Sequence, residues 1–165
     1  MASRLFFDPL VALRTAPLVS STCTLLFAWD QHLFLSNLNL PDTRALSKPV
    51  VRPYFRCLFR RSIAQVLGFV AVTAAASAAN LRAHRPSLSA RGSAPWYAAG
   101  ALLAAGHLLF VPIIAPRVRA LVQDAEVDPN DVLDKWLSVH AVRSLTVDLA
   151  AWVACAVAVG KTFVV

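Results

Sequence analysis

The stretch "WYAAGALLAAGHLLFVPIIA", residues Trp96–Ala115, carries no acidic or basic side chain except His107. At a rise of about 1.5 Å per residue, a helix of this length crosses a hydrocarbon core of about 30 Å. Backbone polar groups in lipid must find their partners inside the same segment, which favours a helix over other conformations. The stretch therefore predicts a membrane-spanning helix.

Three further apolar segments lie around it, at about residues 17–35, 62–81 and 137–159. The 165 residues are 58% hydrophobic, and the mean hydropathy is +0.59, whereas a soluble domain is about 45 to 50% apolar. We therefore predict an all-α fold, a four-helix transmembrane bundle, formed by residues 1–165 as one integral membrane domain.

The formal net charge of +7 comes mostly from connecting segments that contain no nucleic-acid-binding motif. We expect these cations to meet anionic lipid headgroups of a bilayer rather than nucleic acid. The first and third loops hold more Lys and Arg than the other connections, which predicts that these loops are cytosolic. The prediction is a multi-pass membrane protein, with the endoplasmic reticulum as one candidate organelle.

Ionisable side chains inside these segments are the candidate functional residues. Each costs about 2.5 to 3.5 kcal/mol at the centre of a spanning helix, so it usually faces a partner or a cavity. The set comprises Asp30, His32, His107, His140, Arg143 and Asp148. The structural alternative is a buried polar network that fixes how the helices register against one another.

Four of the polar positions are spaced for one helix face. His140, Ser144 and Asp148 follow one another at intervals of four residues, and Trp136 precedes His140 by one turn. We expect a polar stripe that points into the bundle. Asp148 should either pair with a buried cation or stay protonated.

Motifs of other protein classes are missing from the sequence. Hydrolase signatures and a phosphate-binding loop are absent. Three histidines on different segments could ligate a metal in principle, but the three widely spaced cysteines show no zinc-binding pattern. We predict no metal site.

Two quoted segments, "HLLFVPIIAPRVRAL" and "LDKWLSVHAVRSL", resemble the small fungal membrane proteins of the anthrone oxygenase type. The last helix of that family typically opens with a Trp, a His or Asn four residues later, and an Arg three residues further on. Trp136, His140 and Arg143 match this pattern. The resemblance implies a monooxygenase of secondary metabolism that converts a polyketide anthrone to an anthraquinone without a cofactor.

This reaction would need a base, an orienting group and an oxyanion stabiliser. We predict His140 as the base, with Asp148 as its orienting partner or as an alternative base. Arg143 would stabilise the oxyanion. Trp136, His107, Asp30 and His32 are predicted to line the site of an apolar aromatic small molecule.

The competing hypothesis is a non-enzymatic membrane scaffold or accessory protein. A small transporter is a third possibility, disfavoured because the sequence shows no internal repeat or pair of broken helices. An enzyme needs its polar groups to converge on an accessible cavity, whereas a scaffold would bury them in tight pairs.

Overall fold

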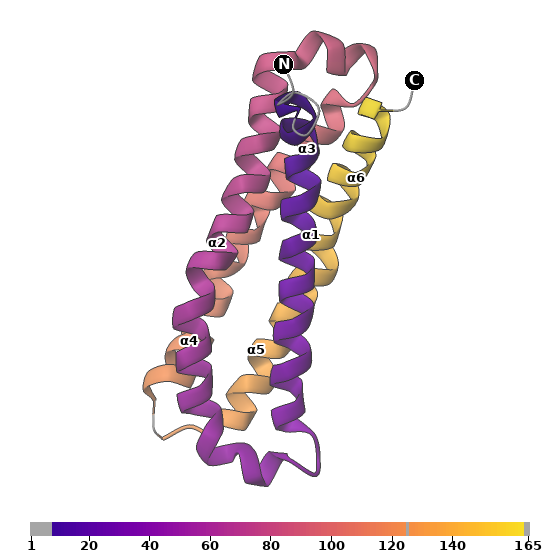
Figure 1. Ribbon diagram of the computed structural model, residues 1–165. Coiled ribbons are helices and arrows are strands. Elements are labelled where there is room, and N and C mark those ends of the chain that lie inside the picture. The colour runs from indigo at the N-terminus through magenta and orange to yellow at the C-terminus, as the bar shows by residue number, and fades with distance from the viewer. Residues whose placement is uncertain (1–7, 125, 164–165) are drawn as a thin grey trace.

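A computed structural model describes residues 8–124 and 126–163. Every described element is helical (Figure 1). The elements are α1 (Pro9–Ser36), η2 (Asn37–Asn39), α2 (Arg44–Ala90), α3 (Ala94–Gly106), η3 (His107–Phe110), α4 (Val111–Gln123), α5 (Pro129–Arg143), η4 (Ser144–Asp148) and α6 (Leu149–Phe163).

These elements join into four long rods that run alternately up and down, with both termini and the turn between α2 and α3 at the same end (Figure 1). The rods span Pro9–Asn39, Arg44–Ala90, Ala94–Gln123 and Pro129–Phe163, and each is long and apolar enough to cross a membrane. The prediction of an all-α four-helix bundle is confirmed. All four rods extend beyond the apolar segments that suggested them, because the flanking residues continue each helix.

Side-chain caps set where two of the rods begin. The carboxylate of Asp8 accepts hydrogen bonds from the backbone of Leu10 and Val11 at 2.8 and 3.3 Å, and Pro9 follows it. Asp128 caps α5 in the same way, accepting from the backbone N–H of Asn130 at 2.9 Å. Such side chains satisfy amide groups that have no partner within the first helical turn.

Two rods contain a turn that departs from α geometry. In the third rod, η3 is a 3₁₀ turn that begins at His107, just before Pro112 in α4. In the fourth rod, η4 is a π-helical turn that ends at Asp148. Single π turns are frequent at functional sites. The side chains of His107 and Asp148 meet between these two turns.

The backbones of α3 and α6 approach each other closely at Gly100. A Cβ atom built on Gly100 would lie 2.8 Å from the Sγ of Cys155. Only glycine fits at this approach without moving the side chain of Cys155. At the end of the bundle away from the termini, the apolar core consists of Leu35, Val51, Phe55, Leu121, Leu133, Trp136 and Leu137.

Candidate functional site

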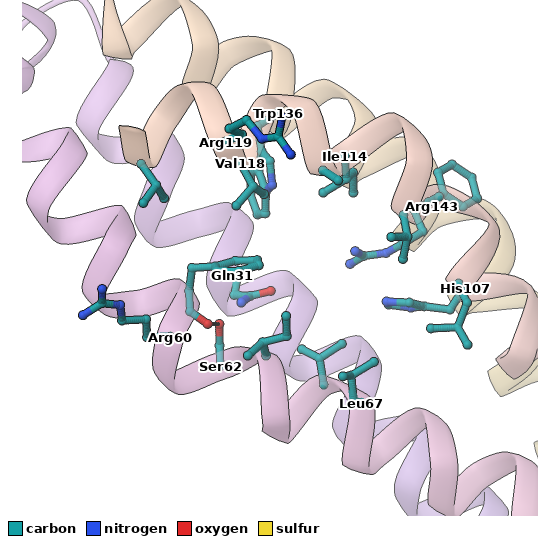
Figure 2. A pocket seen from close by; sticks show the side chains of 18 of the residues that line it. Gln31, Arg60, Ser62, Leu67, His107, Ile114, Val118, Arg119, Trp136 and Arg143 are labelled. Atoms are coloured by element: carbon teal, nitrogen blue, oxygen red, sulfur yellow. Dashed lines mark hydrogen bonds between the residues drawn. The ribbon is translucent and has the colours of Figure 1, made fainter. Parts of the chain in front are cut away.

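A cavity of about 540 Å³ lies in the half of the bundle away from the termini. Its wall is formed by the first part of α2, by η3 and α4, by α5, and by Gln31 of α1 (Figure 2). Most lining side chains are apolar, among them Phe59, Leu67 and Val118. The volume falls in the range of about 300 to 1,000 Å³ that is typical of small-molecule sites.

The carboxylate of Asp148 joins the two ionisable groups at the inner end of this cavity. Its Oδ1 lies 2.9 Å from the Nδ1 of His107, and its Oδ2 accepts a hydrogen bond of 3.2 Å from the Nε of Arg143. All three residues are buried, with 4%, 6% and 7% of their surface exposed for Asp148, His107 and Arg143. Of the two alternatives expected for Asp148, a buried cation as partner or a protonated carboxyl, the contact with Arg143 matches the first.

The π turn explains how Arg143 reaches Asp148. The two residues are five positions apart, which places them on nearly opposite sides of an α-helix, since each residue advances about 100°. A π turn closes hydrogen bonds between residues five apart, so such residues lie above one another. The wide turn thus folds Asp148 back beneath Arg143.

His107 and Arg143 both line the cavity, and Figure 2 shows their side chains pointing into it side by side. In the neutral ring of His107, a proton on Nδ1 is donated to Asp148, and Nε2 keeps an unshared electron pair. Arg143 uses its Nε for Asp148, so the terminal NH₂ groups of the guanidinium remain to bind an anion. The pair can exchange a proton and hold negative charge on a ligand.

His140 lies behind this wall rather than on it. It is 1% exposed, its ring stacks on Trp136 with a centroid separation of 4.5 Å, and His32 lies on it at 6.1 Å. Its Nε2 is 3.3 Å from the Oε1 of Gln31. Because an amide oxygen only accepts, this contact leaves the amide NH₂ of Gln31 as a donor at the cavity.

The structure therefore distributes the predicted site residues over three places. His107 and Arg143 line the polar end of the cavity, where Asp148 binds both from behind, and Trp136 forms part of the wall. His140 and His32 belong to the stack behind Trp136. Asp30 is exposed and does not line the cavity. The partner of Asp148 beyond Arg143 is His107, where sequence reasoning expected His140.

Several lining residues escaped the sequence analysis. Gln31 lines the cavity and lies between Asp30 and His32, but it carries no charge and so was not among the ionisable candidates. Arg60 and Arg119 line the cavity from positions just outside the predicted apolar segments. The signal that could have found them is the continuation of each helix past its apolar run.

Among residues 8–124 and 126–163, no three His, Cys, Asp or Glu side chains come together in a group that could hold a metal ion.

Comparison with known proteins finds relatives along nearly the whole chain. The epoxidase gkaX of Penicillium citrinum is 32% identical over 143 residues, which are 86% of this chain and 88% of that protein. The epoxidase pydX of an Acremonium species is 25% identical, covering 88% and 90% of the two chains. The probable epoxidase scpX of Mollisia scopiformis is 26% identical, covering 85% and 89%. No family model and no solved structure matches the chain.

Proposed function

This chain belongs to the family of the fungal epoxidase gkaX, and from that premise we propose that it is a membrane-embedded oxygenase of secondary metabolism. It would transfer an oxygen atom to a carbon–carbon double bond of an apolar, polyketide-type substrate. The names of its relatives state epoxidation, which is the reaction class we assign to it. An intracellular membrane such as the endoplasmic reticulum is the location we propose.

One observation carries the proposal. His107 and Arg143 open onto a largely apolar cavity while Asp148 holds both from behind. A scaffold protein would bury all of its polar groups in closed pairs, whereas here two of them face space that a ligand can fill. This arrangement supports an enzyme over a scaffold or accessory protein.

His107 and Arg143 at the inner end of the cavity could transfer the protons and stabilise the negative charge that this reaction involves. Epoxidation with O₂ consumes an alkene, O₂, two electrons and two protons, and yields an epoxide and water. The electrons would come from an external two-electron donor. His107, oriented by Asp148, would first take up one of the two protons on Nε2 and then deliver it to the oxygen that leaves as water. Arg143 would stabilise negative charge on reduced oxygen.

A second candidate is the anthrone reaction, favoured by the spacing of Trp136, His140 and Arg143 that this chain shares with that family. There O₂ takes four electrons from the activated CH₂ group of the anthrone; one oxygen atom forms the new carbonyl and the other leaves as water. The substrate itself supplies all electrons, so neither a reductant nor a cofactor would be needed. His107 is placed better than His140 to remove the ring proton, because His107 lines the cavity.

Dependence on a reductant separates the two candidates. Membranes that contain the chain are incubated under ¹⁸O₂ with parinaric acid, a conjugated polyene, or with emodin anthrone, each with and without NADPH. Membranes from cells that lack the chain give the background of spontaneous oxidation. Products are identified by mass spectrometry.

An ¹⁸O-labelled epoxide that requires NADPH supports the epoxidase proposal. Labelled anthraquinone formed above background without NADPH supports the second candidate instead. Rates equal to background with both substrates would contradict the oxygenase proposal for these two substrate classes. The variant His107→Ala should return an active sample to background.

A further inference from the structure

The cavity has a mostly apolar wall, but the charged side chains that line it are all basic. Its lining includes Arg56, Arg60, Arg119 and Arg143, and none of its lining residues is Asp or Glu. A cleft with low-dielectric walls concentrates the field of such charges and attracts anions. A purely hydrocarbon ligand would gain nothing from them.

Two of these arginines are already engaged within the protein. Arg143 donates to Asp148, and Arg56 donates to the backbone carbonyl of Val122 at 2.5 Å. Arg60 and Arg119 form no hydrogen bond or ion pair with any residue of the ranges 8–124 and 126–163, and both are exposed. The carboxylates of Asp128, Asp131 and Asp134 bind Arg44 and Lys48 instead.

The two free arginines lie at the end of the cavity away from His107 and Arg143 (Figure 2). Arg60 precedes Leu67, another lining residue, by seven positions, or about 10 Å along α2. Arg119 follows His107 by twelve positions, or roughly 18 Å along the third rod. The cavity thus has a cationic mouth and a reactive inner end, separated by apolar wall.

We propose that the cavity binds an organic acid, with its anionic group held by Arg60 and Arg119 and its apolar chain extended toward His107. Guanidinium groups pair with carboxylates through two parallel hydrogen bonds, which fixes orientation as well as charge. The double bond to be oxidised then lies up to about 18 Å from the acidic group, the rise between His107 and Arg119. Calling the bound acid a substrate rests on the proposed function; its binding does not.

Lipid headgroups are the other anions that surface arginines meet, and the chain contains a matched control for them. Arg61 is exposed and adjacent to Arg60 but does not line the cavity. Lipid headgroups would be held by Arg61 and Arg60 alike. An acid inside the cavity depends on Arg60 and Arg119 alone.

Fluorescence binding of parinaric acid and of its methyl ester tests this inference. The purified full chain is placed in phosphatidylcholine nanodiscs, without reductant, and compared with Arg60→Gln, Arg119→Gln and Arg61→Gln. We expect the acid to bind about tenfold more tightly than the ester, and Arg60→Gln or Arg119→Gln to abolish most of that preference. Arg61→Gln should bind like the wild type, and Arg60→Lys should retain part of the preference because it keeps the charge.

Equal affinity for acid and ester would overturn the inference, as would equal losses in Arg61→Gln and Arg60→Gln. The second result would identify general attraction by the protein surface. Because no oxygen transfer is measured, acid binding without any epoxide in the activity assay would remove the proposed function and leave this inference standing. Epoxide formation without a preference for acid would do the reverse.

Discussion

The Nε of Arg143 donates a hydrogen bond to the Oδ2 of Asp148, five residues later in the same rod. The π turn between them turns the carboxylate toward the third rod, where its second oxygen meets His107. One change in helical geometry therefore assembles a histidine, a carboxylate and a guanidinium at the end of a cavity.

Removing the carboxylate of Asp148 should destabilise the protein strongly. Asp148→Ala leaves the buried guanidinium of Arg143 without its counter-charge, and loss of one partner of a buried pair costs about 3 to 5 kcal/mol. The thermal midpoint of the detergent-solubilised protein measures the loss. The double variant Arg143→Met with Asp148→Leu removes both charges and should unfold at a higher temperature than Asp148→Ala. A double variant less stable than the single one would contradict the pairing.

His107 should matter more for oxygen transfer than His140. Replacing a proton-transferring group lowers a rate by about 10² to 10⁴-fold, so His107→Ala should lose at least two orders of magnitude at an unchanged protein level. His84 lies in α2, far along the chain from the cavity, and does not line it; His84→Ala is the matched control. Single-turnover product formation is the measurement. A larger loss in His140→Ala than in His107→Ala would return the role of base to His140.

The contact of α3 with α6 should tolerate no side chain at Gly100. A methyl group there would lie 2.8 Å from the Sγ of Cys155, whose residue is fully buried, and overpacking of this kind costs about 1 to 3 kcal/mol. Gly100→Ala should therefore lower the thermal midpoint. Adding Cys155→Ala should restore much of the loss.

The matched control for Gly100 is Gly68 in α2, where an added Cβ would meet nothing within 4 Å. Gly68→Ala should stabilise the helix by up to about 1 kcal/mol, since alanine loses less conformational freedom on folding. Equal effects of the two alanine substitutions would show that the close approach of α3 and α6 does not govern stability.

Stability below neutral pH should depend on the ion pair between Lys48 and Asp128. The hydrogen bond from the Lys48 ammonium lowers the pKa of the Asp128 carboxyl below its ordinary value of 3.8. A carboxyl whose pKa is lower in the folded state stabilises the fold at pH values above 3.8, and this contribution is lost as the pH falls through the folded-state pKa.

The variant Asp128→Asn keeps an N-cap side chain but not the charge. The difference in thermal midpoint between the wild type and this variant should be largest near pH 6 and shrink toward pH 3. Both side chains are partly exposed, so the effect should be small and should weaken in high salt. A difference that stays constant between pH 6 and pH 3 would exclude the charge as its cause.

The fold was predictable because hydropathy is a local property. Each apolar segment, such as Trp96–Ala115, is long enough to cross a membrane by itself, and a single segment in lipid has no stable alternative to the helix. The candidate site was predictable only as a set of residue types. Arg143 and Asp148 stood out because charges inside an apolar helix are costly. Arg143 lines the inner end of the cavity, and Asp148 binds it from behind.

The partners within that set depended on geometry that a regular helix does not have. Regular α spacing aligns His140 with Asp148, and that alignment suggested His140 as the base. The π turn shifts the register by a fraction of a turn and brings Asp148 to Arg143 and His107. His140 instead stacks behind Trp136, where its Nε2 contacts the amide oxygen of Gln31.

By itself the sequence determined four apolar helices, their order and the presence of buried ionisable groups, because these follow from the composition of each segment. Only the tertiary structure decided which of those groups share hydrogen bonds, which face the cavity, and that Arg60 and Arg119 form its mouth. The reason is that contacts between rods depend on helix register. One 3₁₀ turn and one π turn change that register without changing the hydropathy pattern.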